Sequence, residues 1–167
     1  MGVDRAWQGL RRAKELATQA GVAVSWVQAD LEQFHLSSDA FDLIVCSYYR
    51  DPALYPSIRT SLRPGGTLVY QTFTRDQLHF AKGPRNPAHL LEPGELLNAF
   101  VDWNLIFYRE AWSDRGEAAL VARKPKPSDE LETARAVPWI SNWLKHEADE
   151  RAEDRLREAA VRYNREV

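Results

Sequence analysis

The 167-residue sequence contains one cysteine, no Gly-x-Gly motif and no long apolar run. A single cysteine excludes a disulfide within the chain and a metal centre built from several cysteines, and it fits a reducing cytoplasm. No uninterrupted apolar run approaches the roughly 18 residues that a membrane-spanning helix needs. The formal net charge of −2 indicates no surface for nucleic acid or for an anionic membrane. We therefore expect a cytoplasmic protein that binds neither nucleic acid nor membrane and has no metal site.

The composition that remains is that of a folded domain. Hydrophobic residues make up 44% of the chain and aromatic residues 11%, including six tryptophans. A chain of this length can bury a substantial core, so one domain with an appendage is expected.

The central stretch, residues 41–74, predicts the architecture. Residues 41–46 are a short apolar run rich in β-branched side chains, which is typical of a parallel strand covered on both faces. Apolar residues then recur at helical spacing over 54–62, and Pro-Gly-Gly at 64–66 ends that helix. An apolar strand begins at 67–70. Two strands joined through a helix form a right-handed crossover, so an α/β fold with a mostly parallel sheet is expected.

The flanking residues predict further helices and strands by the same patterns. We expect a short strand at 2–4, a helix at 7–20 ended by Gly21, a strand at 22–27, a helix from Pro93 and two final strands at 103–108 and 118–122. The final two strands are close in sequence, which favours an antiparallel pair.

The predicted organisation is a domain over residues 1–124, a proline-containing linker over 125–137 and a helical extension over 138–167. The extension carries an apolar stripe that begins with Trp139 and Trp143. This helix could pack on the domain's own surface, or it could bind a partner or a second copy through its tryptophans.

Several of these features resemble one enzyme family when they are taken in order. Asp4 follows the first short strand, Asp30 follows the next, and Leu-Arg-Pro-Gly-Gly at 62–66 precedes an apolar strand. Together with the terminal strand pair, this pattern is similar to class I S-adenosylmethionine-dependent methyltransferases over residues 2–124. The small tellurite-resistance-type and methyltransferase-domain members are the most similar. The resemblance implies a Rossmann-like, mostly parallel sheet whose last strand is antiparallel.

The resemblance also implies a cofactor site for S-adenosylmethionine. It assigns Asp4 to the ribose hydroxyls and Asp30 to the adenine amino group, with Leu31 offering a backbone N–H and an apolar flank. Cys46, a small hydrophobe in its strand, is placed in the same site. The chemistry agrees, because ligands of open α/β sheets lie beyond the carboxyl ends of the strands and a carboxylate can accept two hydroxyls. Local roles remain open, with Asp4 as a helix N-cap and Asp30 as the cap of a turn.

Substrate contacts are expected where the two central strands end. The candidates are Tyr48, Tyr49, Arg50 and Phe73. Methyl transfer is a direct displacement that needs an aligned acceptor in an apolar, water-poor pocket. The tyrosines could instead simply pack beneath the following loop. His79 and His89 could serve as a base, but both lie in a polar stretch where histidines are usually solvated, so no catalytic residue is assigned.

The glycine-rich turn that holds the amino-acid end of the cofactor in this family has no counterpart in the sequence. The corresponding strand, turn and helix would span on the order of 30 residues, and the strand would be the central one. We therefore expect methyl transfer to a small-molecule acceptor, impaired in this chain. The alternative is a non-catalytic interaction protein that keeps the scaffold and binds a partner through its C-terminal helix.

Overall fold

The computed structural model describes residues 1–112 and 114–127, and residues 1–125 form one compact unit. The predicted linker beyond residue 127 and the predicted helix over 138–167 lie outside the described residues. The alternative function that depends on this helix therefore stays a prediction.

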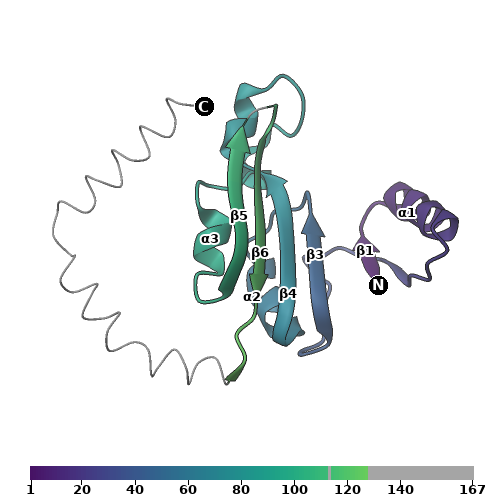
Figure 1. Cartoon of the computed structure of the whole chain (residues 1–167). Helices are drawn as coiled ribbons and strands as arrows, with labels where there is room; N and C mark the ends of the chain where they lie inside the picture. Colours follow the sequence, from purple (N-terminus) through teal and green to yellow (C-terminus); the bar gives the residue numbers. More distant parts are fainter. Residues whose placement is uncertain (113, 128–167) are drawn as a thin grey trace. The chain divides into compact units, whose positions relative to one another are not determined.

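The described chain contains two separate β-sheets (Figure 1). The smaller sheet pairs β1 (Gly2–Asp4) with β2 (Trp26–Gln28) in parallel, and α1 (Trp7–Gln19) connects them. Gly21 follows α1 with φ = +68°, a left-handed conformation that glycine adopts without strain. The predicted first strand and helix are thus present.

The larger sheet has the strand order β3-β4-β6-β5. Its strands are β3 (Phe41–Ser47), β4 (Leu62–Phe73), β5 (Asn104–Trp112) and β6 (Gly116–Arg123). Strands β3 and β4 are parallel, whereas β6 is antiparallel to both β4 and β5. The sheet is therefore mixed, and the last strand alone runs opposite to the other three, as predicted.

One face of the larger sheet carries the core. The helices α2 (Leu54–Ser61) and α3 (Glu95–Ala99) both lie beside it (Figure 1). The cluster buried there comprises Cys46, Leu54, Tyr55, Ile58, Leu62, Leu68, Tyr70, Leu91, Leu96, Phe100, Trp103, Ala118, Leu120 and Ala122. Two short 3₁₀ helices, η1 (Arg75–His79) and η2 (Pro87–His89), interrupt the long connection between β4 and α3.

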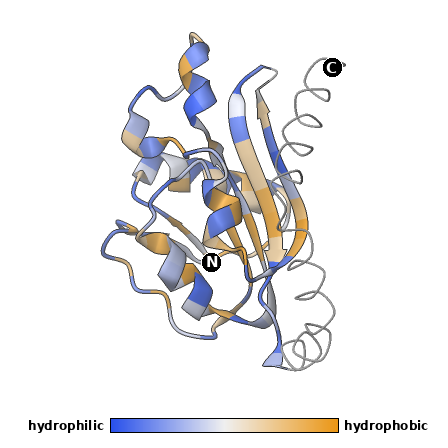
Figure 2. Cartoon of the chain, turned by 90° about the vertical axis from the view of Figure 1, so that its left-hand side faces the viewer, coloured by the Kyte–Doolittle hydropathy of each residue, from blue (hydrophilic) through white to orange (hydrophobic). Residues whose placement is uncertain are grey.

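The strands of this sheet contain many hydrophobic residues (Figure 2), and some of these lie on its other face. Val45, Val69, Val121 and Phe107 are register neighbours across the four strands. Val45 is 59% exposed and Phe107 is 47% exposed. Among the described residues, this face is therefore much less covered than the face that packs on α2 and α3.

Two predicted element boundaries were wrong. The strand expected over 22–27 is confined to Trp26–Gln28, because β1 offers only three residues for pairing and Val22 is largely exposed. The Pro-Gly-Gly segment at 64–66 lies within β4 instead of forming a separate turn. A register shift between Phe41 and Leu43 accommodates it, and a Cβ on Gly66 would lie 2.9 Å from the Arg63 carbonyl oxygen.

A search of the described helices for a membrane span found none with the necessary length and apolar character.

Candidate functional site

A cavity of about 480 Å³ lies where β1, β2 and β3 end. This volume falls within the range of about 300–1,000 Å³ that small-molecule sites occupy. Its lining comes from the last residues of β1 and β3, from the residues that follow the three strands, and from η2, namely Val3, Asp4, Arg5, Ala6, Ala29, Asp30, Leu31, Glu32, Val45, Cys46, Ser47, Tyr48, Tyr49 and His89. The cavity thus brings together six of the eight predicted site residues, and it does not include Arg50 or Phe73.

Asp4 forms the turn between β1 and α1. Its Oδ1 accepts a hydrogen bond from the Ala6 backbone N–H at 2.8 Å. The expected alternative, that Asp4 caps the helix itself, was wrong, since Ala6 holds the N-cap position. A Cβ on Gly9 would lie 3.0 Å from Asp4 Oδ2, so a glycine at this position in α1 leaves room for the second oxygen.

Asp30 lies at the corresponding end of β2 on the same cavity. Its Oδ1 accepts from the Glu32 N–H at 3.2 Å, and its Oδ2 lies 3.7 Å from Arg5 Nη1. Asp30 therefore caps the short turn that follows it, as the alternative prediction held. The contact with Arg5 is worth about 0–1 kcal/mol, because the arginine side chain is largely in solvent. A ligand could displace this arginine at little cost.

The opposite wall comes from the end of β3. Burial raises the pKa of the Cys46 thiol, although a hydrogen bond with Tyr70 lowers it, so the thiol is neutral near pH 7. The Tyr70 hydroxyl donates to the Tyr49 carbonyl oxygen at 2.9 Å and fixes the chain directly after the strand. Burial, followed by the charges of nearby carboxylates including Asp30, raises the pKa of the Tyr49 phenol, which keeps its proton available for donation.

Tyr48 has an unusual backbone conformation for a side chain of its size. Its φ is +54°, in the left-handed region that bulky residues rarely adopt. The ring lies 5.1 Å from that of Phe73, with an angle of 34° between their planes, and it is about half exposed. Phe73 therefore contacts the site through Tyr48 and does not line the cavity itself.

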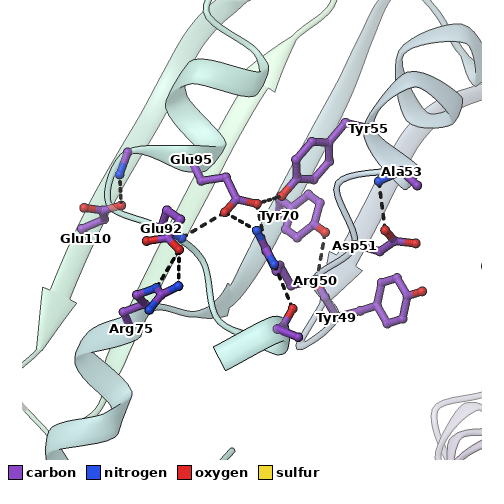
Figure 3. Close-up of polar contacts among 12 residues, drawn as sticks. Tyr49, Arg50, Asp51, Ala53, Tyr55, Tyr70, Arg75, Glu92, Glu95 and Glu110 are labelled. Atoms are coloured by element: carbon purple, nitrogen blue, oxygen red, sulfur yellow. Dashed lines mark hydrogen bonds and ion pairs between the residues drawn. The ribbon is translucent and has the colours of Figure 1, made fainter. Parts of the chain in front are cut away.

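Arg50 does not line the cavity and belongs to a network with α3 and η2 (Figure 3). Its Nε and Nη2 donate to the two carboxylate oxygens of Glu95 at 3.0 and 2.8 Å, and its Nη1 donates to the Ala88 carbonyl oxygen at 2.8 Å. The Tyr55 hydroxyl donates to Glu95 Oε1 at 2.6 Å. Substrate binding by Arg50 stays a prediction, and it would require the guanidinium to leave Glu95.

Glu95 is ionised within this network. Burial alone would raise the pKa of its carboxyl, but hydrogen bonds from Arg50, Tyr55 and the Glu92 N–H hold that pKa below its ordinary value. The side chains of Arg50 and Glu95 are 17% and 13% exposed. The pair is therefore a largely buried, bidentate ion pair that ties the residues after β3 to the first residue of α3.

His89, one of the two histidines that the sequence offered as a possible base, lines the cavity. It lies in η2, whose Asn86 side chain accepts from the Ala88 N–H at 3.0 Å. Because Arg50 holds the Ala88 carbonyl oxygen, the buried ion pair also positions the residue next to it. The histidine reaches the cavity through this tertiary contact, and nothing in the local sequence distinguishes it from His79.

A search for metal-ligand clusters covered only the described residues, and there it found no group of three or more His, Cys, Asp or Glu side chains that could hold an ion.

Comparison with known proteins gives a consistent answer. Residues 1–66 match the family model described as methyltransferase domain. No curated protein matches the sequence. The solved structure of TehB from Haemophilus influenzae is similar over 73% of this chain and 48% of its own length, with 16% identity and a TM-score of 0.60.

Two other solved structures are similar over most of the described chain. The [4+2]-cyclase SpnF shares 17% identity over 75% of this chain and 65% of its own, with a TM-score of 0.58. An S-adenosylmethionine-dependent methyltransferase from Mesorhizobium loti shares 21% identity over 74% of this chain and 79% of its own, with a TM-score of 0.56. The chain thus spans less than two thirds of TehB and of SpnF. One of these proteins is a cyclase, so the fold alone does not fix the reaction. By these findings the chain is similar to the methyltransferase domain family over residues 1–66, and its described part has the fold of S-adenosylmethionine-dependent methyltransferases.

Proposed function

We propose that this protein takes part in S-adenosylmethionine-dependent methyl transfer to a small-molecule acceptor. The observation that carries the proposal is the position of Asp4 and Asp30 on one cavity at the carboxyl ends of neighbouring parallel strands. Ligands of open α/β sheets bind at this edge, and two carboxylates there are suited to the hydroxyl and amino donors of a nucleoside.

The donor set fits the nucleoside half of the cofactor. Asp4 keeps one carboxylate oxygen outside its turn hydrogen bond, and it would hold the ribose hydroxyls. Asp30 would accept from the adenine amino group, while Leu31 and Cys46 would supply apolar contact. When bound, the cofactor would supply the electrophilic methyl group.

The amino-acid half of the cofactor has no matching cradle. The cavity lining contains no glycine, and the sequence has no glycine-rich turn that would let a backbone approach a charged ligand closely. Hydrogen bonds to charged groups contribute roughly 1.5–3 kcal/mol each, so two or three missing bonds cost about 3–9 kcal/mol. Such a loss corresponds to about two to six orders of magnitude in affinity. We therefore propose that this chain alone binds the cofactor weakly and is impaired as an enzyme.

The aromatic wall would receive the acceptor. Tyr48 and Tyr49 border the cavity. The Tyr49 phenol keeps its proton and the Tyr48 side chain is about half exposed, so both hydroxyls can donate to a polar group of the acceptor. His89 lies on the same lining, and its imidazole would be available there to accept a proton. Methyl transfer depends mainly on alignment, so these side chains would orient the acceptor and exclude water.

Calorimetric titration of S-adenosylmethionine, adenosine and methionine separately against the purified chain tests the proposal. We expect adenosine and S-adenosylmethionine to bind within about threefold of one another, both near millimolar, because only the nucleoside is held. Asp4→Asn keeps the turn acceptor but loses the charge, and it should weaken adenosine binding about 10-fold or more.

Glu15→Gln is the matched control, because this exposed carboxylate lies on α1 away from the cavity lining. Micromolar binding of S-adenosylmethionine with far weaker binding of adenosine would refute the incomplete cradle. Unchanged adenosine affinity in Asp4→Asn, or an equal loss in Glu15→Gln, would refute the site itself.

A further inference from the structure

Glu95 lies at the centre of a network of hydrogen bonds behind the cavity wall. Its carboxylate accepts from Arg50 Nε and Nη2, from the Tyr55 hydroxyl and from the Glu92 N–H. The guanidinium of Arg50 also donates through Nη1 to the Ala88 carbonyl oxygen at 2.8 Å. Figure 3 shows this network. None of these five residues lines the cavity, so any effect of the network on the cavity passes through their neighbours.

The bond between Arg50 and Ala88 joins two parts of the cavity wall. Arg50 directly follows Tyr49, whose carbonyl oxygen also accepts from the Tyr70 hydroxyl at 2.9 Å. Ala88 directly precedes His89. Tyr49 and His89 both line the cavity. The bond therefore links two lining segments across 38 residues of the chain.

The segment that carries His89 has little packing of its own. Helix η2 spans three residues, and none of them is buried. A single helical turn is not stable by itself in water, so contacts with its neighbours decide where η2 lies. The Asn86 side chain accepts from the Ala88 N–H at 3.0 Å, and Leu90 is fully buried directly after the turn. Arg50 adds the contact that ties η2 to the end of β3.

The chemistry of the pair suits a role in geometry. Two charged groups are costly to remove from water, and apolar residues of similar volume often stabilise a fold as well or better. A guanidinium is distinguished by its planar fork, which donates in several fixed directions at once. Arg50 directs two nitrogens at Glu95 and the third at Ala88, so the orientation set by the carboxylate is passed on to η2.

We propose that Arg50 and Glu95 are positioning residues for the cavity wall. Through the Ala88 carbonyl oxygen they hold His89 at a fixed distance from Tyr49 across the ligand. Direct substrate contact by Arg50 would need the guanidinium to leave Glu95, whereas positioning needs it to stay. The inference deepens the proposed function, and it rests on that function for the nucleoside that serves as the probe below.

Backbone ¹⁵N relaxation on the ligand-free chain tests the positioning directly. The order parameter of the His89 N–H should be near 0.85 in the wild-type chain, the value of rigid backbone, and should fall below about 0.6 in Arg50→Lys. Lysine keeps the charge beside Glu95 but lacks the fork that also reaches Ala88. Asn86→Ala should free His89 as well, because it removes the acceptor of the Ala88 N–H and leaves the ion pair intact. An unchanged His89 order parameter in Arg50→Lys would overturn the proposal.

Calorimetric titration with adenosine measures what the held wall contributes to binding. We expect Arg50→Lys and His89→Ala each to weaken adenosine binding about three- to tenfold. The double variant should lose no more than the larger single loss, because Arg50 acts through His89. Losses that multiply in the double variant, or an unchanged affinity in His89→Ala, would refute this coupling.

Tyr55→Phe is the matched control, because it removes a donor from the same Glu95 carboxylate and leaves the bonds of Arg50 in place. Its urea midpoint should fall, since a hydrogen bond to a charged group is lost, while its adenosine affinity should stay within about twofold of wild type. A loss of affinity equal to that of Arg50→Lys would show that the network only stabilises the fold, against the proposal. A wild-type chain that binds no adenosine would refute the proposed function, and the His89 order parameters would still decide the positioning.

Discussion

Replacing Glu95 by glutamine tests whether the Arg50–Glu95 pair stabilises the fold. The substitution keeps the side-chain shape but places an amide donor against the arginine and removes the charge that accepts its two hydrogen bonds. Breaking a buried ion pair costs roughly 3–5 kcal/mol. Both side chains retain some exposure, so we expect the lower end, about 3 kcal/mol. This is a large share of the roughly 5–15 kcal/mol that holds a typical domain folded.

Urea denaturation at pH 7 measures this loss. With a slope of about 2 kcal/mol per molar urea, the midpoint should fall by about 1.5 M. Arg50→Met should also destabilise the fold, and the double variant should lose about 1–3 kcal/mol less than the sum of the two single losses. Glu92→Gln is the control, because its pair with Arg75 is half exposed and should contribute at most about 1 kcal/mol. Additive losses, or equal losses for Glu92→Gln and Glu95→Gln, would refute the reasoning.

Three further predictions concern pH, reactivity and packing. The pKa of Glu95 is lower in the folded chain, so its contribution to stability is present above the unfolded pKa of about 4.3 and is lost as the pH falls through the folded pKa. Melting temperatures measured from pH 7 to pH 3 should therefore fall less steeply in Glu95→Gln than in the wild-type chain. Melting temperatures that fall equally in the two proteins would contradict this. Burial, opposed by the Tyr70 hydrogen bond, raises the pKa of the Cys46 thiol. Ellman's reagent at pH 8 should therefore label the native chain at least about tenfold more slowly than the urea-unfolded chain. Equal labelling rates would refute the burial of the thiol. A Cβ on Gly116 would lie 2.3 Å from the Gln77 backbone nitrogen. Gly116→Ala should therefore lower the free energy of unfolding, measured by urea denaturation, by about 1–3 kcal/mol. An unchanged denaturation midpoint would show that the neighbouring backbone moves aside without cost.

The sequence predicts the elements whose signals are local. Helix α1 follows from its apolar spacing and from Gly21, and the hairpin of β5 and β6 follows from two apolar runs a few residues apart. The boundaries of β2 and β4 were missed because pairing decides them. Valine-rich residues before Trp26 have strand propensity but no partner in β1, and the glycines before Thr67 enter a strand through a bulge.

The site was predictable only in part. Asp4 and Asp30 stand directly after strands, so sheet topology places them at one edge. The roles of Arg50 and His89 depend on contacts across about 40 residues, which no local pattern encodes. A lone arginine after a strand looks the same whether it faces a substrate or a buried glutamate.

The interior position of β6 has a consequence during synthesis. This strand is the last to leave the ribosome among those described, yet it separates β4 from β5. A nascent chain that has completed β4 at Phe73 must wait for residue 123 before that edge is covered, about 3–10 s at typical translation rates. During this interval the apolar β4 segment is a natural binding site for a holding chaperone, and slowed elongation between these two points would favour aggregation over folding.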